Sequence, residues 1–512
     1  MAANCRCERS LIHTRLASGL PYNGGLTFSD SRIGRIAASR RCRKAAAAAF
    51  VAGYFLFFTA DGLLAHWAPD DMMNMAGYFE RGGWRALYSQ VLIASDAYRP
   101  AGALFYLPLY TLFGLNPFPF RAVVFLLLAV NVVLFYRVAR LLGAEELVAG
   151  AAALVMSYHA GLAELYYRTS AVYDVLACFF YLSAMLYYLR VRASGRFLGV
   201  GEMVTLLLLF LGALNSKEIA ATLPLLLVAY ECIYHPPETG SREKLRSWLW
   251  RDNRILPILA AIDALYVFGR THGPGALTKI EAYRPVFTLR RAIEFHQNAL
   301  AELFYQADPL SRGALLAVAV VVTYAAWRTM KRDLRFYWFW ILITPLPIEF
   351  LPGRTSFCLY VPLVGWSLLG AAVFVGSARG ISEWLSREPL FTRVRKPVIC
   401  GALIAFGAGA YVWATAVQKR TEVAPRLARH GSRTWSIIQQ LRAIGLKPRA
   451  GDRILFIGDP YEGWDMLFIA QLTFHQPGMR IWLMNKSPKS PPEVAEMDHV
   501  LAFQGDTLRL IR

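Results

Sequence analysis

The chain has 512 residues, of which 56% are hydrophobic and only 18% are charged. The apolar residues form blocks of about bilayer-spanning length, which excludes a soluble globular protein of this size. The formal net charge of +20 does not indicate nucleic-acid binding, because the basic residues lie mainly in short loops between apolar blocks, where they set membrane topology. The sequence therefore predicts an all-α polytopic membrane protein.

A basic segment, 1–44, comes first, and we expect it to be a disordered cytoplasmic tail. Its arginines lie just before the first apolar block, which keeps the tail inside under the positive-inside rule. The first span is predicted at 45–65, followed by an outside segment at 66–117. Within that segment the apolar stretch 101–114 is short and contains Pro108. We expect it to form a helix in the membrane interface rather than a span.

The later apolar blocks complete about eleven spans in a transmembrane domain at 45–420. Each short basic loop falls on the side of the N-terminus, so we expect the N-terminus inside, the C-terminus outside and a location in a bacterial inner membrane. The later spans are predicted at 118–136, 147–162, 172–189, 203–214, 220–234, 255–268, 314–327, 336–348, 359–375 and 398–416.

Residues 421–512 are more polar and predict a small α/β domain outside the membrane. We expect helices at 434–444 and 464–474, a buried strand at 453–457, an extended segment at 479–484, and a hairpin formed by 499–503 and 507–511.

Charged residues near the predicted spans gather on the outer side. Charged groups at membrane depth are costly, so they indicate a functional site. The adjacent Asp70 and Asp71 follow the first span. Taken alone, such a pair is explained more readily by helix capping than by catalysis, and both explanations can hold together. The other charged candidates are Arg99, Glu164, Arg168, Asp174, Lys217, Glu218 and Arg354.

These candidates have simpler explanations as well. Glu164, Arg168 and Asp174 could pair with one another, and the Lys217-Glu218 turn could be a polar turn at the interface.

Acids and cations that converge at a membrane surface suit the transfer of a sugar from a polyprenyl-phosphate donor. A carboxylate deprotonates the acceptor hydroxyl, and basic residues stabilise the charge on the departing phosphate. No nucleotide is required, in keeping with the lack of a dinucleotide-binding fingerprint. Two rival hypotheses are a transporter or lipid flippase, and a non-catalytic envelope-assembly protein.

Several short segments resemble, in their order along 45–420, the GT-C superfamily of multi-span glycosyltransferases. The similarity is greatest to the protein O-mannosyltransferase-like and bacterial lipid-sugar-transferring branches. The segments are 67–71, 98–100, 113–117, 214–218 and 354 with 359–365.

The resemblance implies an inverting glycosyltransferase in which Asp70 or Asp71 is the catalytic base or a metal ligand. It implies that Arg99, Lys217 and Arg354 bind the lipid phosphate. Metal use varies within the superfamily, so a divalent metal at the two aspartates stays open, as do the sugar and the glycan, lipid or protein acceptor. The full set of substrate-binding candidates is Tyr98, Arg99, Glu164, Arg168, Asp174, Lys217, Glu218, Arg354 and Tyr360.

Overall fold

The computed structural model describes residues 27–88, 91, 98–237, 242–273, 275–388, 394–476, 478–484, 486 and 493–512. Most of the predicted N-terminal tail, up to residue 26, lies outside these residues. The first helix, α1 (Thr27–Leu63), begins well before the predicted start at 45. Residues up to Phe50 and residues from Val51 onwards form two compact units, and the description below concerns the second.

Every later predicted span corresponds to a helix. Asn116 illustrates how such a helix begins, because its side chain accepts a hydrogen bond from the Phe118 N–H and Pro117 occupies the first helical turn. The helices are α5 (Pro117–Leu141), α6 (Glu146–Ser157), α8 (Val172–Ala193), α9 (Val200–Leu214), α10 (Leu223–Tyr234), α12 (Ile255–His272), α14 (Arg312–Arg328), α15 (Arg332–Ile343), α17 (Tyr360–Leu385) and α18 (Lys396–Gln418).

Six helical segments among the described residues are long and apolar enough to cross a membrane. Five of them contain α5, α8, α12, α17 and α18, and the sixth is Lys44–Leu63 of α1. The other predicted spans are shorter helices, such as α6 and α9. The all-α polytopic fold predicted from the sequence is confirmed.

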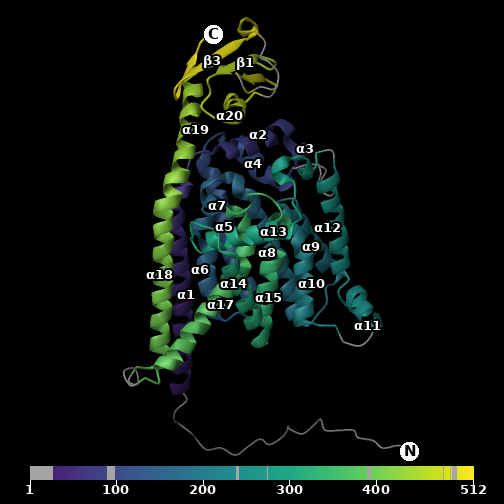
Figure 1. The fold of residues 1–512 in the computed structure, drawn as a ribbon, viewed down its shortest axis with the longest axis vertical. Coiled ribbons are helices and arrows are strands. Elements are labelled where there is room, and N and C mark those ends of the chain that lie inside the picture. The colour runs from purple at the N-terminus through teal and green to yellow at the C-terminus, as the bar shows by residue number, and fades with distance from the viewer. Residues whose placement is uncertain are drawn as a thin grey trace, which may run out of the picture. The chain divides into compact units, whose positions relative to one another are not determined.

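Short helices lie between the longer ones, in predicted loops on both sides of the membrane. The expected interfacial helix at 101–114 is α4, which packs against α2, α3, α5 and α8. In Figure 1, α2, α3 and α4 lie together at one end of the helices, and α11 lies at the other. The α-helices of this group are α2 (Pro69–Arg81), α3 (Gly83–Tyr88), α4 (Pro100–Phe113), α7 (Glu164–Tyr167), α11 (Arg242–Ser247), α13 (Leu289–Leu303) and α16 (Leu346–Glu349).

Single turns complete the connections. They are η1 (Ala160–Leu162), η2 (Thr169–Ala171), η3 (Glu218–Thr222), η4 (Trp248–Asp252), η5 (Leu277–Lys279), η6 (Glu281–Tyr283), η7 (Ser356–Leu359) and η9 (Val494–Glu496).

The C-terminal domain has the predicted α/β composition. A π-helical turn, η8 (Lys419–Val423), joins α18 to the long helix α19 (Ala424–Ile444). The sheet has the order β2-β1-β3-β4, in which β1 is parallel to β2 and β3, and β3 and β4 form the predicted hairpin. Helix α20 packs against α2. The bounds are α20 (Asp465–Phe474), β1 (Arg453–Ile457), β2 (Arg480–Leu483), β3 (His499–Gln504) and β4 (Thr507–Leu510).

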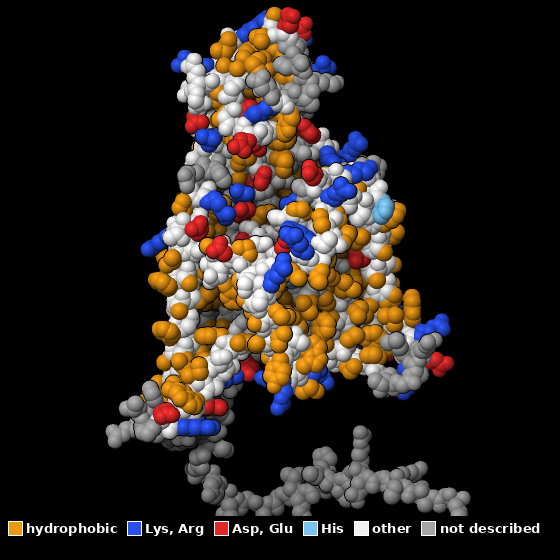
Figure 2. Space-filling view, in the orientation of Figure 1, with side chains coloured by type: hydrophobic (Ala, Val, Ile, Leu, Met, Phe, Trp, Pro, Cys, Tyr) orange, Lys and Arg blue, Asp and Glu red, His pale blue; other side chains and the backbone are white. Residues whose placement is uncertain are grey.

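The surface divides by chemistry. Figure 2 shows hydrophobic side chains over the lower helices, and mixed basic and acidic side chains above them, near the end that carries α2 and α4 in Figure 1. Exposed residues such as Leu126 on α5, Leu208 on α9 and Phe406 on α18 form part of the apolar surface. A hydrophobic belt beside a polar end is what a bilayer requires.

Candidate active site

The two aspartates at the start of α2 lie in opposite environments. Asp71 is fully buried, and its Oδ2 accepts hydrogen bonds from Arg121 at 3.1 Å and from the Ala68 N–H at 3.0 Å. Its Oδ1 accepts the Ser170 N–H at 2.7 Å. The side chain of Asp70 is 59% exposed. Asp71 therefore caps α2 and forms a buried ion pair, whereas Asp70 faces outward.

Asp70 belongs to a chain of ion pairs that leads from the protein surface inward. Its Oδ2 lies 3.6 Å from Nη1 of Arg168, and the same Nη1 lies 3.4 Å from Glu164. Burial and the nearby charge of Asp70 raise the pKa of Asp465 on α20. Three of the predicted site residues thus come together beside the C-terminal domain.

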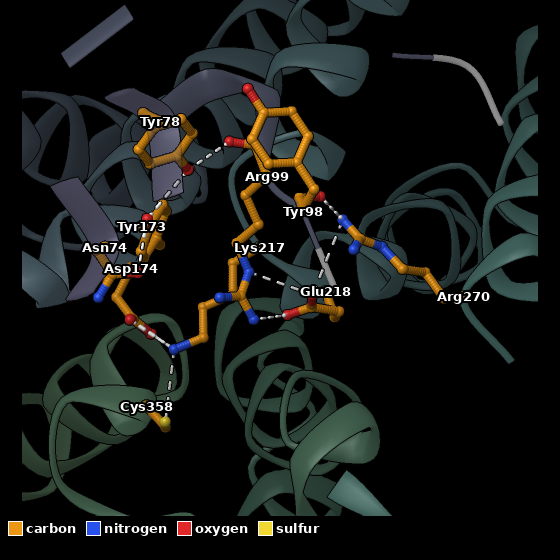
Figure 3. A network of polar contacts seen from close by, with 10 residues as sticks. All are labelled: Asn74, Tyr78, Tyr98, Arg99, Tyr173, Asp174, Lys217, Glu218, Arg270 and Cys358. Atoms are coloured by element: carbon orange, nitrogen blue, oxygen red, sulfur yellow. Dashed lines mark hydrogen bonds and ion pairs between the residues drawn. The ribbon is translucent and has the colours of Figure 1, made fainter. Parts of the chain in front are cut away.

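A second group of predicted residues lies around the turn between α9 and α10 (Figure 3). Nζ of Lys217 contacts both carboxylate oxygens of Asp174, at 2.6 and 2.5 Å. It also lies 3.5 Å from Sγ of Cys358 and 4.9 Å from the centre of the Phe357 ring. Asp174 thus pairs with Lys217, from a different element, rather than with its sequence neighbours Glu164 and Arg168.

The next residue in the turn, Glu218, pairs with two arginines. Arg99 donates to it through Nε at 3.2 Å and Nη2 at 3.0 Å, and Arg270 on α12 approaches to 4.0 Å. Arg270 also donates to the Tyr98 carbonyl at 2.9 Å. Burial opposes ionisation of Glu218, but Arg99 and Arg270 outweigh it and lower its pKa to about 2. The predicted Tyr98 enters this contact through its backbone.

Tyrosines connect this network to α2 (Figure 3). The hydroxyl of Tyr78 donates to the Arg99 carbonyl at 2.7 Å and lies 3.0 Å from that of Tyr173. Tyr173 in turn donates to Asn74 at 2.9 Å, and the Asn74 amide donates to the Asp70 carbonyl at 2.7 Å. Asp70 and Asn74 thus lie one helical turn apart on α2, and Asn74 makes the contact to the network.

The remaining predicted residues, Arg354 and Tyr360, are placed differently. The Arg354 guanidinium lies 4.1 Å from the centre of the Tyr283 ring, and its charge acts on Cys358, the neighbour of Lys217. Tyr360 begins α17 and is 1% exposed. No hydrogen bond between Tyr360 and the charged residues of the network is present in the described part of the chain. Its role as a substrate-binding residue stays a prediction.

We call Arg99, Asp174, Lys217, Glu218, Arg270 and Arg354 the phosphate network, after the lipid phosphate that the resemblance assigns to Arg99, Lys217 and Arg354. The network contains four cationic and two carboxylate side chains. Glu218 holds Arg99 and is approached by Arg270, and Asp174 holds Lys217. Basic side chains in fixed positions suit an anionic group at a membrane surface.

Sequence reasoning missed several residues of the site. Arg270 lies in the last turn of α12, on the predicted outer side, so the signal that singled out Arg354 applies to it as well. Arg121 and Asn74 gave no comparable signal, because their partners Asp71 and Tyr173 are remote in sequence.

The geometry bears on a metal as well. Both carboxylate oxygens of Asp71 accept hydrogen bonds from the protein. Within the described ranges, no group of three or more His, Cys, Asp or Glu side chains is placed to hold a metal ion. The side chain of Asp70, in contrast, is 59% exposed. Of the two aspartates, Asp70 is the one whose carboxylate faces solvent.

Comparisons with known proteins give the fold. No protein-family model matches the sequence, and no curated protein matches it. Among solved structures, the apo oligosaccharyltransferase of Archaeoglobus fulgidus superimposes with a TM-score of 0.50 at 11% identity, over 85% of this chain and 64% of that one. This chain thus spans less than two thirds of that enzyme's length.

The apo structure of ArnT from Cupriavidus metallidurans also gives a TM-score of 0.50, at 10% identity, over 91% of this chain and 93% of ArnT. Both neighbours are GT-C membrane glycosyltransferases. The likeness covers nearly all of both chains in the second case, and it confirms the fold that the resemblance implies. The chain therefore has a GT-C-like fold.

Proposed function

We propose that this protein is a membrane glycosyltransferase that moves a sugar from a polyprenyl-phosphate donor to an acceptor on the non-cytoplasmic face. The observation that carries the proposal is the position of the exposed Asp70, one helical turn from the side chain that joins α2 to the phosphate network. The GT-C-like fold supports the proposal, because this chain aligns with 93% of the length of ArnT and ArnT is a glycosyltransferase.

The phosphate network supplies the charge that the leaving group needs. A polyprenyl phosphate gains negative charge as its bond to the sugar breaks, and fixed cations at that place lower the barrier. Arg99 is held by Glu218 and Lys217 by Asp174, so neither side chain has to reorganise during the reaction. Arg354 adds a third cation against the Tyr283 ring.

Asp70 acts as the general base in this proposal. Its carboxylate takes the proton of the acceptor hydroxyl as the acceptor oxygen forms a bond to the anomeric carbon. The bond from that carbon to the phosphate oxygen breaks, and its electron pair stays on the phosphate. A single displacement inverts the configuration at the anomeric carbon. Arg168, 3.6 Å from Asp70, orients the base.

An assay of sugar transfer from synthetic polyprenyl-phosphate sugars, by the full-length protein in nanodiscs, tests the proposal. Asp70→Asn should lower the rate by about 10²–10⁴-fold, the range typical of a lost general base. Its melting temperature should hardly change, because the side chain is 59% exposed. Glu80→Gln is the matched control, because it also removes an exposed acid from α2. Full transfer by a folded Asp70→Asn variant would refute the assignment of the base.

A further inference from the structure

A cavity of about 740 Å³ lies between the start of α2 and the C-terminal domain. Its volume is within the range of about 300–1,000 Å³ that is common for small-molecule sites. Helix α19 supplies five of the lining residues, so the C-terminal domain forms most of the wall. The lining residues are Pro69, Arg426, Ser432, Arg433, Ser436, Ile437, Tyr461 and Asp506.

The cavity adjoins the proposed base. Pro69, in its wall, directly precedes Asp70. From the opposite wall, Arg426 reaches Glu164 at 3.8 Å, Glu164 contacts Arg168 at 3.4 Å, and Arg168 contacts Asp70 at 3.6 Å. A molecule in the cavity would therefore lie beside the carboxylate that takes the proton.

Close packing fixes the α19 wall. The Trp435 ring stacks on His66 at 5.1 Å with an interplanar angle of 7°. Gly431 faces the His66 backbone so closely that a Cβ atom would lie 2.9 Å from the His66 carbonyl oxygen. On the other side, the hydroxyls of Thr434 and Tyr461 lie 3.2 Å apart. These contacts fix the backbone of α19 at the cavity and the position of the Tyr461 hydroxyl.

The lining identifies the kind of ligand. Its two arginines already have acidic partners, since Arg426 lies near Glu164 and Arg433 lies 3.3 Å from Asp506. In each pair the arginine donates hydrogen bonds and the carboxylate beside it accepts them, as neighbouring sugar hydroxyls require. Three further hydroxyl groups line the space, and Pro69 and Ile437 are its apolar residues. A peptide acceptor would need apolar pockets for anchoring side chains.

We infer that this cavity binds the acceptor of the reaction, and that the acceptor is a saccharide or the saccharide part of a larger molecule. The assignment of the ligand as the acceptor rests on the proposed function. The assignment of the ligand as a saccharide rests on the cavity lining. It gives the C-terminal domain a role in substrate specificity. The small lining residue Ser436, exposed on α19, is the position at which the cavity can be filled.

The test compares saccharide binding with transfer, using the full chain in nanodiscs. The probes are methyl glycosides of glucose, mannose and N-acetylglucosamine and short N-acetylglucosamine oligomers, observed by saturation-transfer NMR. Ser436→Trp should weaken binding of the best probe by about tenfold or more, since an indole would occupy the space of the sugar. Ala443→Trp is the control, because residue 443 is also exposed on α19 but does not line the cavity.

In the transfer assay, Ser436→Trp should raise the KM for the same saccharide. The two variants should have the same affinity for the polyprenyl-phosphate donor. Equal saccharide binding by the two variants, or no probe bound by the unmodified protein, would overturn the inference. The inference would also be overturned if the unmodified protein transferred sugar to a peptide and Ser436→Trp abolished that transfer. Saccharide binding without transfer would instead refute the proposed function and leave the cavity as a saccharide site.

Discussion

Burial gives the adjacent aspartates of α2 different tasks. Asp71 and Arg121 are 0% and 1% exposed, so each is a charge that has lost its water and depends on the other. The exposed Asp70 keeps contact with solvent and with Arg168. A buried pair is weak evidence of net stabilisation, but removal of one partner leaves the other uncompensated. The two residues should therefore respond differently to the same substitution.

We predict that Asp71→Asn destabilises the protein by roughly 3–5 kcal/mol, the cost typical of breaking a buried ion pair. The asparagine amide also cannot accept hydrogen bonds on both sides, as the Asp71 carboxylate does from Ala68 and Ser170. Thermal unfolding of the detergent-solubilised protein measures the effect, with Asp70→Asn as the control. A melting temperature of Asp71→Asn equal to that of the control would contradict a structural role.

Which acid pairs with which base was not predictable from the sequence. Lys217 and Asp174 are 43 residues apart, and Arg99 and Glu218 are 119 residues apart. The topology predicted from the apolar blocks and basic loops put all four residues on the outer side. This shared side was the reason to propose a common site. The pairs themselves depend on how α4, α8 and the α9–α10 turn pack together, and no local pattern records that packing. The sequence therefore predicted five of the six residues of the phosphate network, Arg270 being the exception, but not the contacts between them.

Helix packing determines how closely α4 approaches its neighbours. Gly102 lies where α4 meets α2 and α8, and a Cβ atom there would lie 2.1 Å from the Tyr78 hydroxyl oxygen and 2.6 Å from the Tyr173 ring. The glycine is thus required by the tyrosine contact that joins α2 to the phosphate network. By contrast, Gly77 on α2 has nothing within 4 Å of the corresponding position.

We predict that Gly102→Ala separates Tyr78 from Tyr173, lowers the rate of sugar transfer and destabilises the protein by about 1–3 kcal/mol, as overpacking does. Gly77→Ala is the matched control and should be neutral or stabilising, because alanine favours the helix by about 1 kcal/mol over glycine. Unfolding midpoints and transfer rates of the two variants test this. Equal behaviour of the two alanine variants would show that the close approach at Gly102 has no consequence.

The elements themselves were largely predictable. The strand at 453–457 and the helix at 464–474 agree with β1 and α20 to within a residue, because short apolar runs bounded by turns define both. The continuation of α18 through a π-helical turn into α19 was not anticipated. Its cause is tertiary, since Lys419 in that turn donates to the Phe58 carbonyl at 2.7 Å and pairs with Asp61 at 2.9 Å.

At the scale of the whole molecule, the polar residues of the proposed site and the basic loops lie at opposite ends. The helices α2 and α4 lie beside the C-terminal domain, and the basic helix α11 lies at the far end of the bundle (Figure 1). Basic residues in short loops mark the cytoplasmic side. From this rule we predict that the phosphate network and the cavity lie on the outer side, where the proposed donor presents its sugar.

We predict that alkaline phosphatase fused after Arg512 is active in a bacterial host, because the enzyme folds only outside the cytoplasm. The same enzyme fused after Arg387, in the basic loop that follows α17, should be inactive. Green fluorescent protein at the two positions is the control and should give the opposite pattern. If the fusion at Arg512 were fluorescent and lacked phosphatase activity, Asp70 and the phosphate network would face the cytoplasm. Transfer on the outer face would then be refuted even if the protein proved to be a glycosyltransferase.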